Sequence, residues 1–399
     1  MRLLLVADTY PPARISGALQ MHDLATALAR FGHRPAVLVP ARLESGGFQQ
    51  SLESGVDVLR VQAPRTKDVP YLQRTLAEWR LPAALLRGLR ASPLQRERWD
   101  GIVWYSPTIF LGPLVRALRR EQNCPSYLIV RDLFPDWAAD AGVLRRGGLP
   151  FRLFKQVERY QYRHAGVIGV QTPSNVALAC REAPPCARIE VLHNWLSPPR
   201  EARGVVVPSE KLAGRTILVY AGNMGVAQEL DAFVELAKRL VFRVDVGLLF
   251  IGRGSEAARL KQIAQRLGNL DVRDEVAPDD LVEVLNACHV GIIALHTAHR
   301  THNIPGKLLT YLHAGLPVLA RVNRGNDLAA LLTRENVGLV VEGDDADRLD
   351  AQARTLVDDA ALRSAMGRRG RQVAERLFSP EAAAGQVIQG LLSQRDGHA

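Results

Sequence analysis

Residues 300–318 read RTHNIPGKLLTYLHAGLPV, and this stretch carries the clearest structural signal in the chain. It follows an apolar run, turns through Pro305 and Gly306, and continues with helical spacing to a Gly-Leu-Pro stop that leads into another apolar run. Lys307 stands at the start of the predicted helix, where backbone N–H groups and one point charge together suit a diphosphate. The stretch therefore predicts a strand-turn-helix-strand unit with an anion site at its turn.

Similar units lie on both sides of this stretch. In the first half, apolar runs at 2–8, 37–39, 56–61, 101–105, 127–130, 164–170 and 188–192 alternate with helical segments such as 17–31 and 109–120. In the second half, runs at 216–222, 246–252, 290–295, 317–322 and 337–342 repeat the pattern. Strands that alternate with helices indicate a parallel sheet covered by helices on both faces. We expect an α/β protein with two doubly wound, Rossmann-like sheets.

The length of 399 residues suits two domains of ordinary size. Residues 196–204 are polar, contain two prolines and have no periodicity, as a linker would. The predicted domains are 1–198 and 205–378, and the helical segment 379–399 is expected to cross back to the first. Because ligands bind beyond the carboxyl ends of parallel strands, two such domains facing one another predict one deep cleft.

Composition excludes several other classes of protein. Apolar residues make up 47% of the chain and charged residues 23%, which is typical of a globular α/β protein. No run of about 18 apolar residues predicts a membrane span, and Asp8 interrupts the N-terminal apolar run too early for a signal peptide. We therefore expect a cytoplasmic protein. Its cysteines form no CxxC motif and no metal-ligand cluster, so we expect reduced thiols and no metal cofactor at Cys124, Cys180, Cys186 and Cys288.

The positive charge is confined to the first half of the chain. Residues 1–200 carry 27 Lys and Arg against 16 Asp and Glu, whereas the second half is nearly balanced. Residues 65–98 add eight basic residues mixed with Leu, Tyr and Trp, an arrangement that suits an interfacial surface on anionic lipid. A pair of ordinary amphipathic helices would have a similar pattern. No nucleic-acid-reading module accompanies the charge, so a nucleic acid is not an expected partner.

Glycine-rich turns follow several of the predicted strands. Gly17 opens the first predicted helix, and Gly222 with Asn223 follows the first strand of the second domain. Arg253 stands between two glycines one unit later. Such turns present backbone N–H groups to a phosphate or another anion. None of them completes the GxGxxG fingerprint of a dinucleotide site.

Four motifs of this chain together resemble those of family 4 of the GT-B glycosyltransferases. They are the Tyr-Pro-Pro opening with Gly17, the phrase at 130–137, the Gly-Asn-Met-Gly turn at 222–225, and the run at 305–318. More narrowly, the chain resembles bacterial surface-polysaccharide enzymes of the N-acetylfucosamine transferase type. The resemblance extends over nearly the whole chain. It implies two domains that face a deep cleft between them.

The resemblance also implies roles for individual residues. Lys307 and Arg253 would hold the donor diphosphate, and Gly17 would approach it from the other domain. The turn would contact phosphate and sugar through Asn303, Ile304 and Gly306. The family commonly has two glutamates in this run, one for the donor sugar and one for the ribose, and this chain has His302 and Thr310 in their places.

Catalytic candidates on the acceptor side follow the predicted strand at 127–130. Many family members have a histidine in the comparable loop, where this chain has Arg131 and Asp132. Asp132 or Asp136 is expected to lie on the cleft side, where a carboxylate could position or deprotonate an acceptor hydroxyl. The alternative roles are a structural salt bridge for Asp132 and helix capping for Asp136.

These observations predict a retaining glycosyltransferase that needs no metal. The expected donor is a UDP-linked N-acetylated deoxyhexose or hexose, and the expected acceptor is a polyprenyl-diphosphate-linked saccharide of O-antigen, capsule or exopolysaccharide synthesis. The basic half would place the enzyme peripherally on the inner membrane. Two other functions remain open, a GT-B UDP-sugar epimerase and a sugar-nucleotide-binding partner without turnover. Release of UDP only when acceptor is supplied would favour the transferase.

Overall fold

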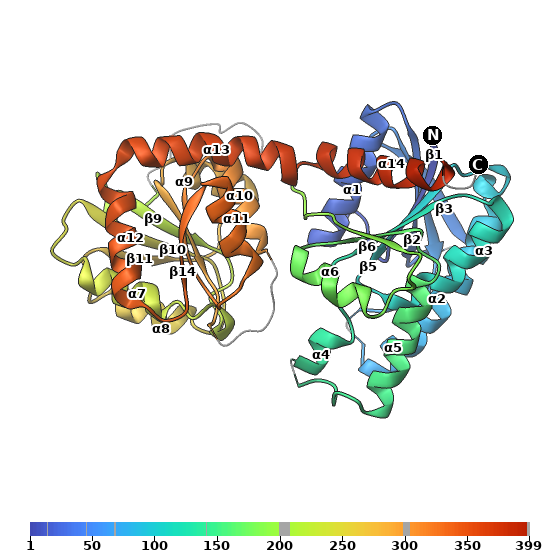
Figure 1. The fold of residues 1–399 in the computed structure, drawn as a ribbon, viewed down its shortest axis with the longest axis horizontal. Helices are drawn as coiled ribbons and strands as arrows, with labels where there is room; N and C mark the ends of the chain where they lie inside the picture. The colour runs from blue at the N-terminus through green and yellow to red at the C-terminus, as the bar shows by residue number, and fades with distance from the viewer. Residues whose placement is uncertain are drawn as a thin grey trace. The chain divides into compact units, whose positions relative to one another are not determined.

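The computed structural model describes residues 1–13, 15–44, 46–67, 69–140, 142–198, 208–297 and 304–396. The chain forms two compact units (Figure 1). Unit 1 consists of Met1–Trp195 together with the chain from Pro380 onward, and unit 2 consists of Leu196–Ser379. Each unit is a sheet between two layers of helices, which confirms the predicted α/β class.

The sheet of unit 1 has eight strands in the order β3-β4-β2-β1-β5-β6-β7-β8. Adjacent strands are parallel except for β3, which pairs antiparallel with β4 at the edge. The three central strands β2, β1 and β5 are almost wholly buried, as expected for a sheet covered on both faces. The strands are β1 (Arg2–Val6), β2 (Arg34–Ala41), β3 (Phe48–Glu53), β4 (Val56–Gln62), β5 (Gly101–Ser106), β6 (Ser126–Val130), β7 (Val167–Val170) and β8 (Arg188–Val191).

Helices from both ends of the chain cover one face of this sheet. Met21, Leu24 and Leu28 of α1 (Ser16–Arg30) share a core with Val387 and Leu391 of α14 (Pro380–Asp396). The opposite face is covered by helices from the middle of unit 1, which form a second core. These are α2 (Tyr71–Ala91), the 3-10 turn η2 (Ile109–Leu111), α3 (Gly112–Gln122), α5 (Leu149–Tyr162) and α6 (Pro173–Cys180), while the short α4 (Asp136–Asp140) follows β6.

The sheet of unit 2 has six parallel strands in the order β11-β10-β9-β12-β13-β14. One face packs on α7, α8 and α12, and the other on α9, α10, α11 and α13. The strands are β9 (Thr216–Ala221), β10 (Val246–Ile251), β11 (Leu270–Arg273), β12 (Val290–Ala294), β13 (Val318–Val322) and β14 (Gly338–Glu342). The helices are α7 (Asp231–Arg239), α8 (Ala257–Ala264), α9 (Pro278–Asn286), α10 (Gly306–Ala314), α11 (Asp327–Glu335), α12 (Ala346–Asp358) and α13 (Ala360–Phe378).

The basic segment 65–98 differs from one of the two predicted alternatives, the pair of helices. It forms one 21-residue helix, α2, followed by the 3-10 turn η1 (Pro93–Arg96), and so is not a helical pair. Leu81, Leu85 and Leu89 of α2 are buried in the core of unit 1. Tyr71, Leu72 and Trp79 remain exposed on its first half. Pro82 lies inside the helix without ending it.

Two negative findings hold for the described part of the chain. No helix there is both long and apolar enough to cross a membrane. No group of three or more His, Cys, Asp or Glu side chains there is arranged to hold a metal ion. Ligands of such folds bind at the carboxyl ends of the parallel strands.

Candidate functional site

Helix α10 begins with a turn that leaves its first N–H groups without a side-chain cap. Its N-cap is Pro305, in extended conformation, and no acidic side chain occupies the first turn. The helix ends at Gly315, whose φ of 72° is the left-handed conformation that glycine adopts without steric cost. Tyr311 anchors α10 to the sheet, because its buried hydroxyl accepts the backbone N–H of Ala221 at 2.8 Å. The positive end of the helix dipole thus lies at the carboxyl end of β9.

Lys307 is the cation of this helix start. Its Nζ donates to the Tyr220 hydroxyl at 2.7 Å and lies 3.9 Å from the centroid of the Tyr220 ring. Burial lowers the pKa of Lys307 to about 7, and no carboxylate among the described residues pairs with it. Desolvation favours the neutral form of this partly buried lysine, and a bound anion would favour the charged ammonium. The site is therefore built to receive negative charge.

Two glycine loops approach this lysine closely. Gly222, after β9, has a φ of 141°, and a Cβ placed there would lie 3.4 Å from the Lys307 side chain. Gly252, after β10, has a φ of 149°, and its Cβ would lie 1.9 Å from the Gly222 carbonyl oxygen. The loops are joined by a hydrogen bond from the Met224 N–H to the Arg253 carbonyl at 2.7 Å. Only residues without a side chain fit where these backbones meet.

Gly252→Ala is expected to lower the melting temperature by several degrees and to weaken nucleotide-sugar binding. A Cβ at 1.9 Å from a carbonyl oxygen must push the two loops apart, and a side chain at this φ adds about 1–3 kcal/mol of backbone strain. Thermal unfolding of both proteins measures the change. Gly268→Ala, in the same unit but with open space around the new methyl group, is the matched control and should unfold like wild type.

The other predicted donor residues of unit 2 differ in their placement. Asn223 is exposed and its side-chain amide donates to Gln228 at 3.2 Å, while its carbonyl accepts the Tyr220 hydroxyl. Arg253 is 82% exposed and pairs with Glu275 at 3.1 Å, a surface ion pair of little stability that leaves the guanidinium free to change partner. Ile304 is buried, Gly306 is exposed, and Thr310 lies one helical turn after Lys307. His302 and Asn303 lie outside the described residues.

Sequence reasoning missed a buried arginine beside this site. Arg321 lies in the otherwise apolar β13 and is 6% exposed. It pairs with Glu229 at 2.9 Å and with Asp344, and Thr297 donates its N–H to Glu229 and its hydroxyl to Asp344. These contacts join residues at or beyond the carboxyl ends of four strands of unit 2, which are β9, β12, β13 and β14. The signal that would have revealed it is a charged residue in the middle of the buried run Val-Leu-Ala-Arg-Val.

In unit 1, Gly17 allows α1 to approach the sheet. A Cβ at Gly17 would lie 3.1 Å from Cε1 of Tyr105, the second-last residue of β5. The Tyr105 hydroxyl donates to Gln20 at 3.0 Å, one turn further along α1. The N-terminal end of α1 is therefore fixed at the carboxyl edge of the sheet, where a side chain at position 17 would separate the two.

Arg131 is held inside unit 1 by contacts with the residues that follow β8. Its guanidinium donates to the carbonyls of Leu192 at 2.8 Å and His193 at 3.3 Å and stacks 4.6 Å from the centre of the Trp195 ring. Burial lowers its pKa to about 10, which leaves it charged at neutral pH. With both terminal nitrogens of its guanidinium donating to protein carbonyls, Arg131 has the contacts of a positioning residue that shapes the loop after β6.

Asp132 is the exposed neighbour of Arg131 and has the freedom that Arg131 lacks. Desolvation by the surrounding protein raises the pKa of the Asp132 carboxyl, and Arg131 offsets part of that shift. Its carboxylate accepts no hydrogen bond from the described residues. Asp136, by contrast, is engaged in a network around Lys155, which also contacts Glu158 at 2.7 Å and Glu182 at 3.3 Å. Asp132 is thus available to a substrate, whereas Asp136 ties α4 to α5.

A polar cluster at the carboxyl end of β1 was also missed. Asp8 lies 3.7 Å from Lys67, and its other carboxylate oxygen is buried without a hydrogen-bond partner among the described residues. Desolvation raises the pKa of Asp8. Glu78 of α2 accepts the Thr108 hydroxyl at 2.9 Å and pairs with Arg74 at 2.7 Å. The cluster brings polar groups from α2 and from the turn after β5 to the edge of the sheet where a ligand of unit 1 would bind.

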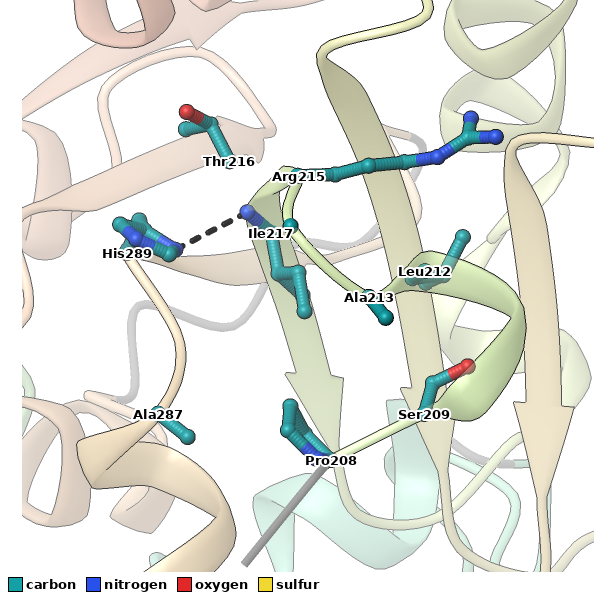
Figure 2. Close-up of a pocket in the computed structure, with 10 residues that line it drawn as sticks. Pro208, Ser209, Leu212, Ala213, Arg215, Thr216, Ile217, Ala287 and His289 are labelled. Atoms are coloured by element: carbon teal, nitrogen blue, oxygen red, sulfur yellow. Dashed lines mark hydrogen bonds between the residues drawn. The ribbon is translucent and has the colours of Figure 1, made fainter.

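A hollow of about 400 Å³ lies elsewhere in unit 2 (Figure 2). It opens at the amino ends of β9 and β12, where the Ile217 N–H donates to Nδ1 of His289 at 3.0 Å. This edge is opposite to the one that carries Lys307. Nδ1 of His289 is already occupied by this hydrogen bond, which joins β9 to the start of β12. We therefore assign this hollow no part in the site.

Comparison with known proteins agrees with this geometry. Residues 17–195 match the family model "Glycosyl transferase 4-like domain", and residues 215–359 match "Glycosyl transferases group 1". The chain is 23% identical over 305 residues to the probable glycosyltransferase WbjE of Pseudomonas aeruginosa, with 74% of this chain and 75% of that one covered. It is 24% identical over 313 residues to the putative colanic acid biosynthesis glycosyl transferase WcaI of Escherichia coli K12, again covering 74% and 75%.

Solved structures show the same fold. The glycosyltransferase WaaG, involved in lipopolysaccharide biosynthesis, superposes with a TM-score of 0.62 at 16% identity, over 96% of this chain and 99% of that one. Anabaena HepE in complex with UDP superposes with a TM-score of 0.64 at 13% identity, over 98% and 100%. At these identities the likeness shows the architecture of the two units alone.

Proposed function

We propose that this chain, which is a glycosyltransferase of the GT-B fold in polysaccharide biosynthesis, moves a sugar from a UDP-linked donor to a lipid-linked saccharide with retention of anomeric configuration. The observation that carries the proposal is Lys307, a partly buried lysine at the uncapped start of α10 that has no carboxylate partner within the described chain. The donor's diphosphate supplies the missing negative charge. UDP in the HepE complex supports the choice of nucleotide.

The chemistry of departure follows from this arrangement. When the bond between the sugar and the diphosphate breaks, negative charge grows on the leaving oxygen. Lys307 and the N–H groups at the start of α10 are fixed where they stabilise that charge, and Arg253 is free to add a second cation. Asn303, Ile304 and Gly306 would line the phosphate and sugar, and His302 and Thr310 would replace the glutamates common in the family. We expect an N-acetylated deoxyhexose or hexose as the donor sugar.

The acceptor side belongs to unit 1. Asp132, exposed and with a raised pKa, would accept the proton of the attacking hydroxyl, Arg131 would hold its loop, and Gly17 would let α1 approach the donor. The names of WcaI and WaaG support a surface-polysaccharide acceptor, for which we propose a polyprenyl-diphosphate-linked saccharide. The exposed apolar and basic residues of α2 support a peripheral position on the cytoplasmic face of the inner membrane.

The test measures UDP release from a panel of UDP-sugars with and without a prenyl-diphosphate-linked N-acetylhexosamine. We expect release that depends on the acceptor, together with a glycosylated product. UDP-sugar interconversion without acceptor would show an epimerase, and binding without any product would show a non-catalytic partner. Either result would overturn the proposal. A thermal-shift screen with the same sugars identifies the donor, because a bound ligand raises the melting temperature.

Donor binding is expected to take up a proton above neutral pH. Lys307, with its pKa of about 7, is mostly neutral at pH 8 in the free protein and becomes charged beside a diphosphate. The affinity for UDP should therefore fall by up to about tenfold for each pH unit above 7. Calorimetry of UDP binding in two buffers with different ionisation enthalpies measures the uptake. Lys307→Met should abolish it, and an unchanged uptake in that variant would contradict the assignment.

A further inference from the structure

A groove of about 570 Å³ lies between α2, α3 and α5 of unit 1. Its walls include Trp79 and Leu86 of α2, Phe110 of η2, Pro113 of α3, and Leu153 of α5, and every lining side chain except Gln156 is apolar or aromatic. The edge of the Trp79 ring packs against Phe110, with centroids 6.0 Å apart, and forms one wall. The volume falls within the range of about 300–1,000 Å³ in which proteins bury small ligands.

The apolar surface continues beyond the groove. Trp79 is 59% exposed and Leu153 53% exposed, and Leu72 and Leu149 at the first turns of α2 and α5 are more than 80% exposed. Both helices begin on the side of the sheet where the strands end, so these side chains lie on the same side of unit 1 as the candidate acceptor residues. Contiguous exposed apolar surface of this kind marks a contact with a partner.

The charges around the groove identify the chemistry of that partner. Arg80 lines a neighbouring hollow that shares Ala83 with the groove, and Arg152 lies one helical turn before Gln156 of the groove. Both arginines are exposed, and neither has an ion pair within the described ranges. On the other side of Trp79, Glu78 joins the polar cluster with Thr108 and Arg74. An apolar channel that borders cationic and hydrogen-bonding groups is complementary to an anionic lipid with a polar head.

We propose that this groove binds the hydrocarbon chain of the acceptor, with the acceptor's diphosphate beside the arginines and its saccharide toward the polar cluster of Asp8, Glu78 and Thr108. The inference rests on the proposed function, because it takes a lipid-linked acceptor as given. A concave, apolar-walled channel encloses one chain, whereas a bilayer surface is met by side chains that protrude. Binding of the chain would give long-chain acceptors an affinity that their head groups alone do not supply.

The test compares two probes with the same diphosphate, farnesyl diphosphate and isopentenyl diphosphate, by calorimetry below the concentration at which farnesyl diphosphate aggregates. We expect wild type to bind the longer chain at least about tenfold more tightly, because several additional CH₂ groups are buried. Ala83→Trp, which fills the groove from an exposed position, should remove that preference and leave isopentenyl diphosphate binding unchanged. Leu153→Gln should weaken the preference without filling the groove.

Leu178→Gln is the matched control, since Leu178 is an exposed leucine of unit 1 that lies outside the groove. It should bind both probes like wild type. Equal affinity of wild type for the two probes, or a preference that survives Ala83→Trp, would overturn the inference. So would loss of binding to anionic vesicles in Ala83→Trp with the chain preference intact, which would make the groove a bilayer contact. The readout needs no turnover, so failure of the proposed reaction would be recognised separately.

Discussion

Lys307→Met is expected to lower kcat by about 10²–10³-fold, the usual loss when one fixed donor to a developing anion is removed. The reason is that Lys307 is partly buried at the start of α10 without a carboxylate partner within the described chain, so the leaving diphosphate is the charge we expect it to meet. Steady-state UDP release with saturating acceptor measures the effect. Lys238→Met, at an exposed lysine of the same unit, is the control and should retain full activity.

The same variant should not unfold more easily. The folded-state pKa of Lys307 is about 7, below the value of about 10.4 for an exposed lysine, so burial of this side chain destabilises the fold fully below pH 7 and progressively less as the pH rises toward 10. Lys307→Met should therefore have a melting temperature equal to or higher than that of wild type at pH 7. A wild-type turnover rate, or inactivity caused by unfolding, would contradict the assigned role.

Asp132→Asn is expected to reduce turnover by about 10²–10⁴-fold, the range for loss of a general base. Asp132 is exposed beyond β6, accepts no hydrogen bond from the described residues, and has a pKa raised by desolvation. Because the carboxylate form is the active one, wild-type turnover should fall as the pH drops through this raised pKa. The acid limb of the pH–rate profile should disappear in the residual activity of the variant. A limb that persists unchanged would assign the base to another residue.

Asp136→Asn separates a catalytic effect from a structural one. Asp136 belongs to the ion network of Lys155, which also includes the buried Glu158. The variant loses the contacts of Asp136 with Lys155 and Arg146, which tie α4 to its surroundings, so it should lose some stability while Lys155 stays paired with Glu158 and Glu182. Its turnover at a temperature where it remains folded should stay close to that of wild type. The two aspartates lie four residues apart, and the contrast between them tests the assignment of the base.

The sequence predicted the buried strands well and the polar elements poorly. Runs such as 246–252 and 290–295 carry no charged or polar side chain and correspond to β10 and β12, because strands covered on both faces need no alternation. The edge strand β3 was missed, since Phe-Gln-Gln-Ser-Leu-Glu exposes polar residues and lacks a continuous apolar run. In unit 2 the edge strand β11 was missed for the same reason, because only two of its four residues are buried.

The donor side of the site was predictable in part. Pro305, Gly306 and Lys307 specify a turn and a charged helix start through local chemistry alone. That Lys307 contacts Tyr220 depends on the pairing of β9 with β12 and on the packing of α10, which no local pattern encodes. Likewise the sequence suggests that Arg131 is a cation available to a ligand. Only the positions of Leu192 and Trp195 show that its guanidinium is already bound by the protein.

The most direct measurement is a crystal structure with UDP bound. We expect the diphosphate to lie within hydrogen-bond distance of the Lys307 ammonium and of the first backbone N–H groups of α10, with the glycine loop at Gly222 beside it. UDP bound at another place on unit 2, with the Lys307 ammonium still donating only to Tyr220, would contradict the central claim.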